Sequence, residues 1–506
     1  MLPFGEGPAS NGEFLPAAPS AHDRDIFAAT LAEVEQAAHR AAIDRRLFLR
    51  GAGGVAAALT VFNLAACSGG SRRSEGSTTS RSTSTSSTTS TPGGTFTVPT
   101  TADVPACQRA LAGDELIFDV HTHHVMPQRP WRQTAPATVG LVRGMLPECS
   151  APDPFECANR DAYLHSMFLT SDTTISMLTD VPATGPDDAP MPFSDAVGTQ
   201  QFAAQLTGGG ASRVLVHNII APNFGALNER LDGMEATAAT GKVAAFKVYT
   251  AWGPNGRGYA LDDPAIGLPV VQKARDLGVK VIVAHKGIPL LNFDSAHNGP
   301  EDMVAASRVF PDMQFVVFHS NWNPNHTEGP YNPAAPIGID RLIAALDAHR
   351  VPPNSNVWVD LGAIWRSLLR RPDQAAHMLG KLLSRVGENR VMWGTDAVWY
   401  GSPQPQIMAF RAFQISEEFQ ERFRYPALTD ALKRKVFGLN AALLFDVDPE
   451  ATRCALATDP IAGARAEATD LHDTGIAPPA WHPNGPTTRR EMLRWLAAPA
   501  TRWTPF

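Results

Sequence analysis

Residues 117–125 read IFDVHTHHV, an apolar start followed by an acid and three histidines. The pair Ile117–Phe118 is typical of a buried β-strand. Side chains at positions i and i+2 of a strand point the same way, so His121 and His123 are expected to share one face. Two interpretations follow: a polar strand end in a loop, or half of a metal site. The rest of the chain has to decide between them.

Seven further β-rich runs follow this stretch and alternate with helical patterns. Most of the runs are nearly all apolar, as expected for parallel strands covered on both faces. Amphipathic stretches separate several of them, and Gly278 stands where a helix C-cap favours glycine. The eight expected strands are 116–120, 174–179, 213–220, 244–249, 280–284, 314–318, 356–360 and 390–394.

Eight strands that alternate with helices predict an α/β fold of the (β/α)8 TIM-barrel type. A doubly wound sheet is the alternative, and it is disfavoured because no glycine-rich phosphate loop follows the first strand. The barrel is expected to span residues 106–447. Residues 448–506 carry several prolines and are expected to form a C-terminal extension that wraps the barrel.

Side chains that can bind a metal stand at the ends of several expected strands. The active sites of such barrels lie at the carboxyl ends of the strands, so these groups are expected to meet at one mouth. Their convergence favours the metal-site interpretation. They are His121 and His123 on the first strand, Lys247 on the fourth, His285 on the fifth, His319 on the sixth and Asp396 after the eighth.

This pattern resembles the amidohydrolase superfamily. The segment LKRKVFGLNAALLF at 432–445 resembles the Gly-x-Asn-Ala helix that ends the amidohydrolase-related branch, and the Gly-Thr-Asp of 394–396 also fits it. That branch includes aminocarboxymuconate semialdehyde decarboxylase-like enzymes, and the resemblance covers about residues 114–447. It implies a metal-dependent hydrolase of a small substrate, with a metal-dependent nonoxidative decarboxylase, a lyase, as the alternative. A surface-anchored barrel that binds metal or ligand without turnover is a third interpretation.

The resemblance also implies roles for individual residues. His121, His123, His285 and Asp396 would hold one divalent metal, with Zn2+ expected and Mn2+ or Fe2+ compatible with the same ligands. A bound metal lowers the pKa of its water toward 7. Asp396 would then handle the proton of that water. His319 would polarise the substrate or shuttle a proton.

Other polar residues near the strand ends receive weaker interpretations. In binuclear amidohydrolases a carboxylated strand-four lysine bridges two metals, so Lys247 is a candidate bridge, although a mononuclear site is favoured. Asp119 is expected to make a structural hydrogen bond to a neighbouring strand, and His124 to point away from the site. Asp360 is expected to cap a loop, and His217 receives no role.

Aromatic residues gather after the same strand ends, which favours an aromatic-walled pocket for a ring-bearing substrate. Loop packing is expected to account for at least half of them. Arg132 and Arg257 are expected to meet a carboxylate in that pocket. The aromatic residues are Tyr249, Trp252, Trp322, Trp365, Trp399 and Tyr400, of which Trp252, Trp322 and Trp399 are the pocket candidates.

Residues 1–67 resemble a bacterial export signal. The pair Arg45–Arg46 resembles a twin-arginine signal, and residues 51–63 form an apolar run shorter than the ~20 residues that span a bilayer. The segment Leu64-Ala65-Ala66-Cys67 resembles a lipobox, whose cysteine is lipidated; a buried helix is the alternative. The resemblance implies export to the cell envelope, periplasmic or outer surface, with membrane attachment through Cys67.

Residues 68–105 are dense in serine and threonine and are expected to be a disordered linker. The formal net charge of −7, with only 18% charged residues, does not favour a nucleic-acid partner. The expected partner is a small-molecule substrate, and a homodimer is left open.

Four cysteines remain besides Cys67, an even number that favours disulfides in an oxidising compartment. Three pairings are compatible with the sequence. The preferred one joins Cys149 to Cys157 within one loop, and Cys107 to Cys454 across the flanks of the barrel.

Overall fold

A computed structural model describes most of the chain between residues 93 and 465. None of the helices in that part is long and apolar enough to cross a membrane. Arg45, Arg46, Cys67, Cys107 and Tyr400 lie outside the described residues. The described ranges are 93–96, 115–146, 151–207, 212–369, 371–399, 401–457 and 459–465, together with the single residues 28, 32, 36 and 39.

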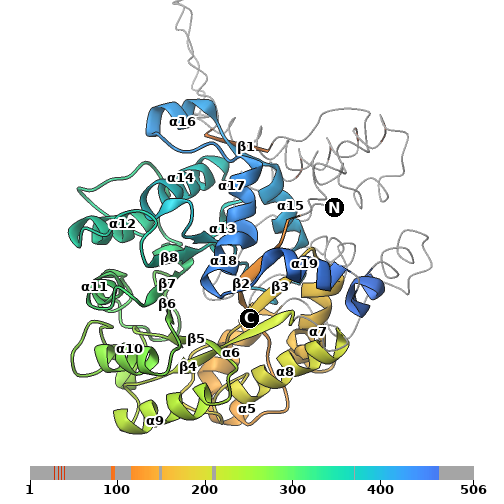
Figure 1. Cartoon of the computed structure of the whole chain (residues 1–506), viewed down its shortest axis with the longest axis vertical. Coiled ribbons are helices and arrows are strands. Elements are labelled where there is room, and N and C mark those ends of the chain that lie inside the picture. The colour runs from red at the N-terminus through yellow and green to blue at the C-terminus, as the bar shows by residue number, and fades with distance from the viewer. Residues whose placement is uncertain are drawn as a thin grey trace, which may run out of the picture.

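Eight parallel strands form one sheet in chain order, with helices around it (Figure 1). The sheet closes through a bridge between Thr122 and Ala397, and the Val120 N–H donates to the Trp393 carbonyl at 3.0 Å. The predicted TIM barrel is therefore confirmed, and the doubly wound alternative fails because the last strand meets the first. The strands are β2 (Phe118–Thr122), β3 (Ile175–Leu178), β4 (Val214–Ile220), β5 (Val243–Val248), β6 (Val281–His285), β7 (Gln314–Phe318), β8 (Val357–Asp360) and β9 (Val391–Met392).

The amphipathic stretches of the sequence form helices that follow the strands. Gly278 has φ 76° just after α10, the left-handed conformation for which glycine is suited. The longer helices are α6 (Pro136–Met145), α8 (Phe193–Leu206), α9 (Leu227–Ala238), α10 (Gly267–Asp276), α11 (Glu301–Val309), α12 (Ile339–Ala348), α14 (Pro372–Leu382), α15 (Gln404–Ala412), α16 (Glu417–Phe423) and α19 (Pro449–Ala457). The shorter ones are α5 (Trp131–Thr134), η1 (Pro154–Ala158), α7 (Arg160–Leu164), η2 (His165–Leu169), η3 (Pro254–Gly256), η4 (His319–Asn321), α13 (Ile364–Leu368), η5 (Leu383–Gly387), α17 (Asp430–Arg434), η6 (Lys435–Leu439) and α18 (Asn440–Leu444).

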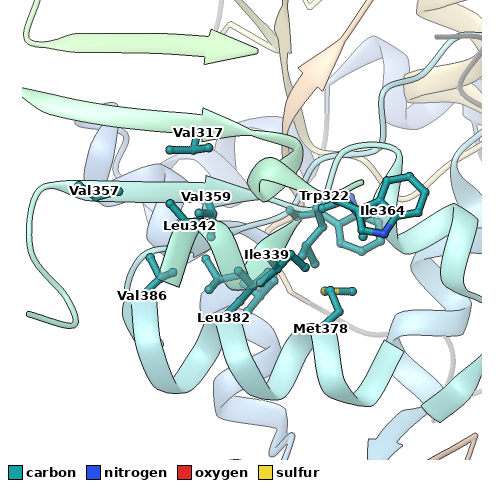
Figure 2. Packing of buried hydrophobic residues seen from close by; sticks show 14 of the residues in the cluster. Val317, Trp322, Ile339, Leu342, Val357, Val359, Ile364, Met378, Leu382 and Val386 are labelled. Carbon is teal, nitrogen blue, oxygen red and sulfur yellow. The ribbon is translucent and has the colours of Figure 1, made fainter. Parts of the chain in front are cut away.

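Alternation along the strands divides the core into two layers. Val357 and Val359 of β8 point outward, where they lie with Leu342 of α12 and Leu382 of α14 in one apolar cluster (Figure 2). Trp358 lies in a separate cluster inside the barrel. Each fully buried apolar side chain contributes about 1.5–3 kcal/mol to folding. This alternation also fixes which residues at the strand ends face the barrel mouth.

Residues 93–96 belong to the fold, so the linker prediction is wrong at this point. Strand β1 (Gly94–Phe96) pairs antiparallel with β10 (Phe413–Ile415). A Cβ atom on Gly94 would come within 2.4 Å of the Pro372 carbonyl oxygen. Only a glycine therefore lets the chain approach α14 this closely.

The described part of the C-terminal extension is tied to the barrel by ion pairs. Arg213 holds Asp459 with two contacts of 2.8 Å, and Arg465 pairs with Asp172. Burial opposes ionisation of Asp172, but Arg465 and Arg411 outweigh it and lower its pKa to about 2. Charge pairing therefore anchors this segment.

The predicted pairing of Cys107 with Cys454 is wrong. Cys454 is an exposed free cysteine on α19, where α-helical geometry leaves its thiol at the surface. Cys157 is disulfide-bonded. Its predicted partner, Cys149, lies outside the described residues, so that pairing stays a prediction.

Candidate metal centre

The five residues proposed as ligands or proton carriers meet at one end of the barrel, and all of them are buried. His121 Nε2 and His123 Nε2 lie 3.5 and 3.1 Å from the same Asp396 oxygen, Oδ1. His285 Nδ1 lies 3.1 Å from His319 Nε2. His121, His319 and Asp396 each offer a ligand atom, and these atoms lie within 4.8 Å of one another. The strand ends therefore converge as the sequence predicted.

Unusual backbone conformations aim these side chains into the mouth. His319 and Asp396 both have φ 60°, in the left-handed region that non-glycine residues seldom adopt. Each such residue costs about 1–3 kcal/mol unless its surroundings hold it there. The Asp396 N–H is held by the His121 carbonyl at 2.8 Å. Strain of this kind concentrates at functional sites.

Hydrogen bonds to backbone carbonyls orient two of the histidine rings at the mouth. His285 Nε2 donates to the Ile288 carbonyl at 2.6 Å, and His319 Nδ1 donates to the Gly362 carbonyl at 3.0 Å. A carbonyl only accepts, so each neutral ring has its one N–H committed there. His285 Nδ1 and His319 Nε2 lie 3.1 Å apart. The two carbonyl contacts therefore fix how these rings are oriented toward each other at the mouth.

Asp360 supports two of these histidines, although the sequence suggested only a loop cap. Its Oδ2 accepts from His121 Nδ1 at 2.8 Å, and its Oδ1 accepts from the His319 N–H at 2.6 Å. The first bond commits the ring proton of His121 and leaves Nε2 with a lone pair toward Asp396. Burial raises the pKa of Asp360 to about 6. Cβ atoms on Gly362 and Gly394 would come within 2.6 Å of the Asp360 carboxylate. Gly362, two residues after the acidic end of β8, was the missed signal.

Asp119 makes the structural hydrogen bonds predicted for it. It accepts from the Thr395 N–H at 3.0 Å, from the Thr395 hydroxyl, and from the His121 N–H at 3.1 Å. Burial raises the pKa of this carboxyl to about 8. These hydrogen bonds fix the position of Thr395, the residue directly before Asp396. His124, as predicted, points elsewhere, with its Nε2 2.9 Å from the Thr199 hydroxyl.

The electrostatics of the mouth favour neutral imidazole. Burial, followed by the positive charge of Lys247, holds the pKa of His121 well below its usual value. Neutral imidazole is the form that binds metals. Lys247 is itself fully buried, with Nζ 4.8 Å from the ring centres of Tyr249 and Phe318. Its role as a bridge between two metals stays a prediction.

The predicted pocket residues fall into two groups. The Trp399 ring stacks on His123 at 5.2 Å, and the Tyr249 ring stacks on His285 at 5.5 Å. Trp322 instead packs with Ile339 in the outer apolar cluster (Figure 2), and its place in the pocket stays a prediction. Trp365 is in the same cluster, as loop packing predicts.

The remaining pocket candidates have other contacts. Trp252 is half-buried against the Phe224 ring at 4.5 Å. Arg132 Nη1 pairs with Asp153 at 2.5 Å, which neutralises the charge expected to meet a substrate. Arg257 is exposed to solvent.

Two buried polar residues near the mouth were missed. Asp180 follows β3 and accepts from the Val181 and Met191 N–H groups at 2.8 and 3.1 Å, and burial raises its pKa to about 8. His217 interrupts the apolar run of β4, and it lies inside the barrel. A polar residue within a parallel strand was the signal available for His217.

Comparison with known proteins gives one family match. Residues 225–447 match the model of the amidohydrolase family Amidohydro_2. The matched segment contains His285, His319 and Asp396, whereas His121 and His123 lie before it in the chain. No curated protein sequence matches the chain.

Several solved structures resemble the chain at low identity. An uncharacterized TIM-barrel protein from Bordetella bronchiseptica is 14% identical with a TM-score of 0.42, covering 65% of this chain and 98% of its own. A dihydroorotase from Campylobacter jejuni is 11% identical with a TM-score of 0.37, covering 66% and 84%. A 2,6-dihydroxybenzoate decarboxylase from Rhizobium is 12% identical with a TM-score of 0.38, covering 66% and 99%.

Proposed function

We propose that this protein is a metal-dependent hydrolase of the amidohydrolase superfamily that acts on a small molecule at the barrel mouth. The observation that carries the proposal is the meeting of buried imidazoles and a carboxylate at the barrel mouth, where the Nε2 atoms of His121 and His123 lie 3.5 and 3.1 Å from Asp396 Oδ1 and His319 lies 3.1 Å from His285. The family match over residues 225–447 supports the same conclusion, because it includes His285, His319 and Asp396.

The donor set fits a divalent metal. In a tetrahedral zinc site with bonds of about 2.1 Å, neighbouring ligand atoms lie about 3.4 Å apart. Asp396 Oδ1 lies 3.5 and 3.1 Å from the Nε2 atoms of His121 and His123. These three residues and His285 would hold the metal, with Zn2+, Mn2+ and Fe2+ all compatible. The metal would supply hydroxide near neutral pH.

The chain's own groups would manage protons and orientation. Asp396 Oδ1 would accept the proton of a water bound beside it. His319, whose Nδ1 is committed to the Gly362 carbonyl, would act on the substrate through Nε2. Asp360 would keep His121 in the tautomer that presents Nε2. Trp399 would wall the site on the His123 side.

A nonoxidative decarboxylase is the second candidate. The fully buried Lys247, held between the rings of Tyr249 and Phe318, favours it, because a buried ammonium suits a carboxylate-bearing substrate. Product analysis separates the two reactions: a decarboxylase releases CO2, whereas a hydrolase adds water across an ester, lactone or amide.

Metal content, measured by elemental mass spectrometry on the chain purified without chelator, tests the proposal. We expect about one transition metal per chain. His121→Ala should abolish metal binding, while cooperative thermal unfolding of the metal-free variant checks that the chain still folds. His349→Ala, on a half-buried histidine after α12, is the matched control and should keep the metal.

The alternative outcomes are equally informative. About two metals per chain would move Lys247 and His319 into the ligand set. No metal, even after reconstitution with Zn2+ or Mn2+, would refute both enzyme proposals and leave a ligand-binding barrel.

We also propose that the chain is exported and attached to a membrane through Cys67. The proposal is supported by the order of Arg45–Arg46, the apolar run and the lipobox-like segment. Membrane fractionation of the parent chain and of Cys67→Ser tests it. Equal recovery of both proteins in the soluble fraction would contradict it.

A further inference from the structure

His217 is a buried imidazole for which the proposed metal centre gives no role. It lies on β4 with only 3% of its surface exposed, and neither ring nitrogen has a hydrogen-bond partner among the described residues. Buried polar groups are nearly always hydrogen-bonded, because an unpaired one forfeits the bonds it made to water. An unpaired imidazole inside the barrel therefore indicates a missing partner.

Other buried histidines of the chain show what a structural role looks like. His377 Nδ1 lies 2.9 Å from the Tyr425 hydroxyl, and His124 Nε2 lies 2.9 Å from the Thr199 hydroxyl. His217 has no such contact. It also stands apart from the cluster of His121, His319 and Asp396, the only group of potential metal ligands within the described residues.

The register of β4 and β5 directs His217 and Lys247 to the same interior. His217 pairs with Ala245, and Ile219 pairs with Lys247. Residues paired in a parallel register share a face, and Ala245 belongs to the apolar cluster inside the barrel. Lys247, on the adjacent strand, therefore lies on the same inner face as His217 and nearer to the mouth.

One phenyl ring connects both residues to the metal centre. The Phe318 ring lies 5.8 Å from the His217 ring and 4.8 Å from Lys247 Nζ, measured to ring centres. The same ring stacks on His121 at 3.8 Å. A group held by His217 and Lys247 would thus lie beside Phe318, the ring that stacks on the proposed ligand His121.

We propose that His217 and Lys247 form an anion subsite that binds the carboxylate of the substrate. Lys247 supplies a positive charge, and His217 supplies one N–H donor. The rings of Phe318 and Tyr249 beside Lys247 favour an acid that carries its carboxylate on a flat, unsaturated or aromatic body. This inference rests on the proposed function, since it names the class of substrate that the metal centre would receive.

Calorimetric titration of the metal-loaded full chain with benzoate, and with uncharged benzamide as the matched probe, tests the subsite. We expect benzoate to bind at least tenfold more tightly than benzamide. His217→Phe keeps the ring volume and removes the donor, so it should weaken benzoate binding about tenfold and leave benzamide binding unchanged. His217→Gln restores an N–H donor and should recover most of the affinity.

Two further variants complete the design. Lys247→Met removes the charge and should weaken benzoate binding about a hundredfold, since hydrogen bonds to charged groups are stronger. His349→Phe, remote from the mouth, should behave as the parent does. If His217→Phe does not fold, the benzoate affinities of Lys247→Met and His217→Gln still test the anion subsite.

Three outcomes would overturn the inference: no preference for benzoate in the parent, unchanged benzoate affinity in His217→Phe, or unchanged affinity in Lys247→Met. Metal content measured on the same samples separates the two proposals. Normal metal content with benzoate binding insensitive to His217 refutes the subsite alone. Absent metal with benzoate binding that still depends on His217 refutes the hydrolase and keeps the subsite.

Discussion

Replacing Asp360 by asparagine tests how the centre is held, because it changes one atom and no volume. The carboxylate now accepts from His121 Nδ1 at 2.8 Å and from the His319 N–H at 2.6 Å. An asparagine has one accepting atom, its oxygen, and one donating NH2 group. If the oxygen stays with the His319 N–H, the NH2 group faces the Nδ1–H of His121. His121 must then move its proton to Nε2, which removes the lone pair facing Asp396.

The expected magnitude follows from the loss of one oriented ligand. Removing the partner that orients a metal-binding histidine weakens metal affinity by about 10- to 100-fold. We expect a change in this range for Asp360→Asn in a competitive titration against a chelator of known affinity. Thermal unfolding of the metal-free protein checks that the variant folds.

A second buried aspartate provides the control. Asp459 accepts from Arg213 with two contacts of 2.8 Å, before the start of β4 and therefore at the end of the barrel opposite the mouth. Asp459→Asn should lower stability by about 3 kcal/mol, because it weakens a buried charge pair, yet leave metal affinity unchanged. An Asp360→Asn protein that binds metal within twofold of the parent would refute the tautomer argument.

Three further predictions use other parts of the chain. Gly362→Ala places a Cβ atom 2.5 Å from His121 Nδ1 and should reduce metal content, as measured by elemental analysis. Gly233→Ala is the control and should keep the metal, because nothing lies within 4 Å of the added carbon. The pKa of Asp172 is lowered from 3.8 to about 2, so its contribution of about 2 kcal/mol is present above pH 4 and lost as the pH falls toward 2. Urea unfolding should therefore show Asp172→Asn less stable than the parent at pH 6, with a gap that narrows below pH 4; a constant gap would contradict this. Iodoacetamide should label Cys454 in the native protein, as read by peptide mass spectrometry, and protection of Cys454 would contradict its exposure.

The fold was predictable because each strand carries its own signal. Apolar runs, helical periodicity and glycine caps are local features, and they located all eight barrel strands. Strand β1 was missed for the opposite reason. Its three residues have no pattern of their own, and it is held by segments distant in sequence, namely strand β10 and the Pro372 carbonyl.

The convergence of the candidate ligands was predictable from the strand ends, but the direction of nearby side chains was not. Trp322 follows His319 closely in sequence, yet it packs outside the barrel. The reason is the turn η4, in which His319, Ser320 and Asn321 all have positive φ and reverse the chain. Strand periodicity cannot be extended through such a turn, so an aromatic residue three positions after His319 need not face the same pocket as His319 does.

Asp360 shows why the supporting groups were harder to find than the ligands. It lies 239 residues from His121, and their contact exists only because the barrel closes. The seam between β2 and β9 is short, since β9 has two residues, and side chains add to its backbone bonds. Asp119 of β2 holds Thr395 across this seam, directly before Asp396. The bonds that close the barrel thus also set the distance between His121 and Asp396, so a cation bound by these two residues would stabilise the closed barrel by mass action.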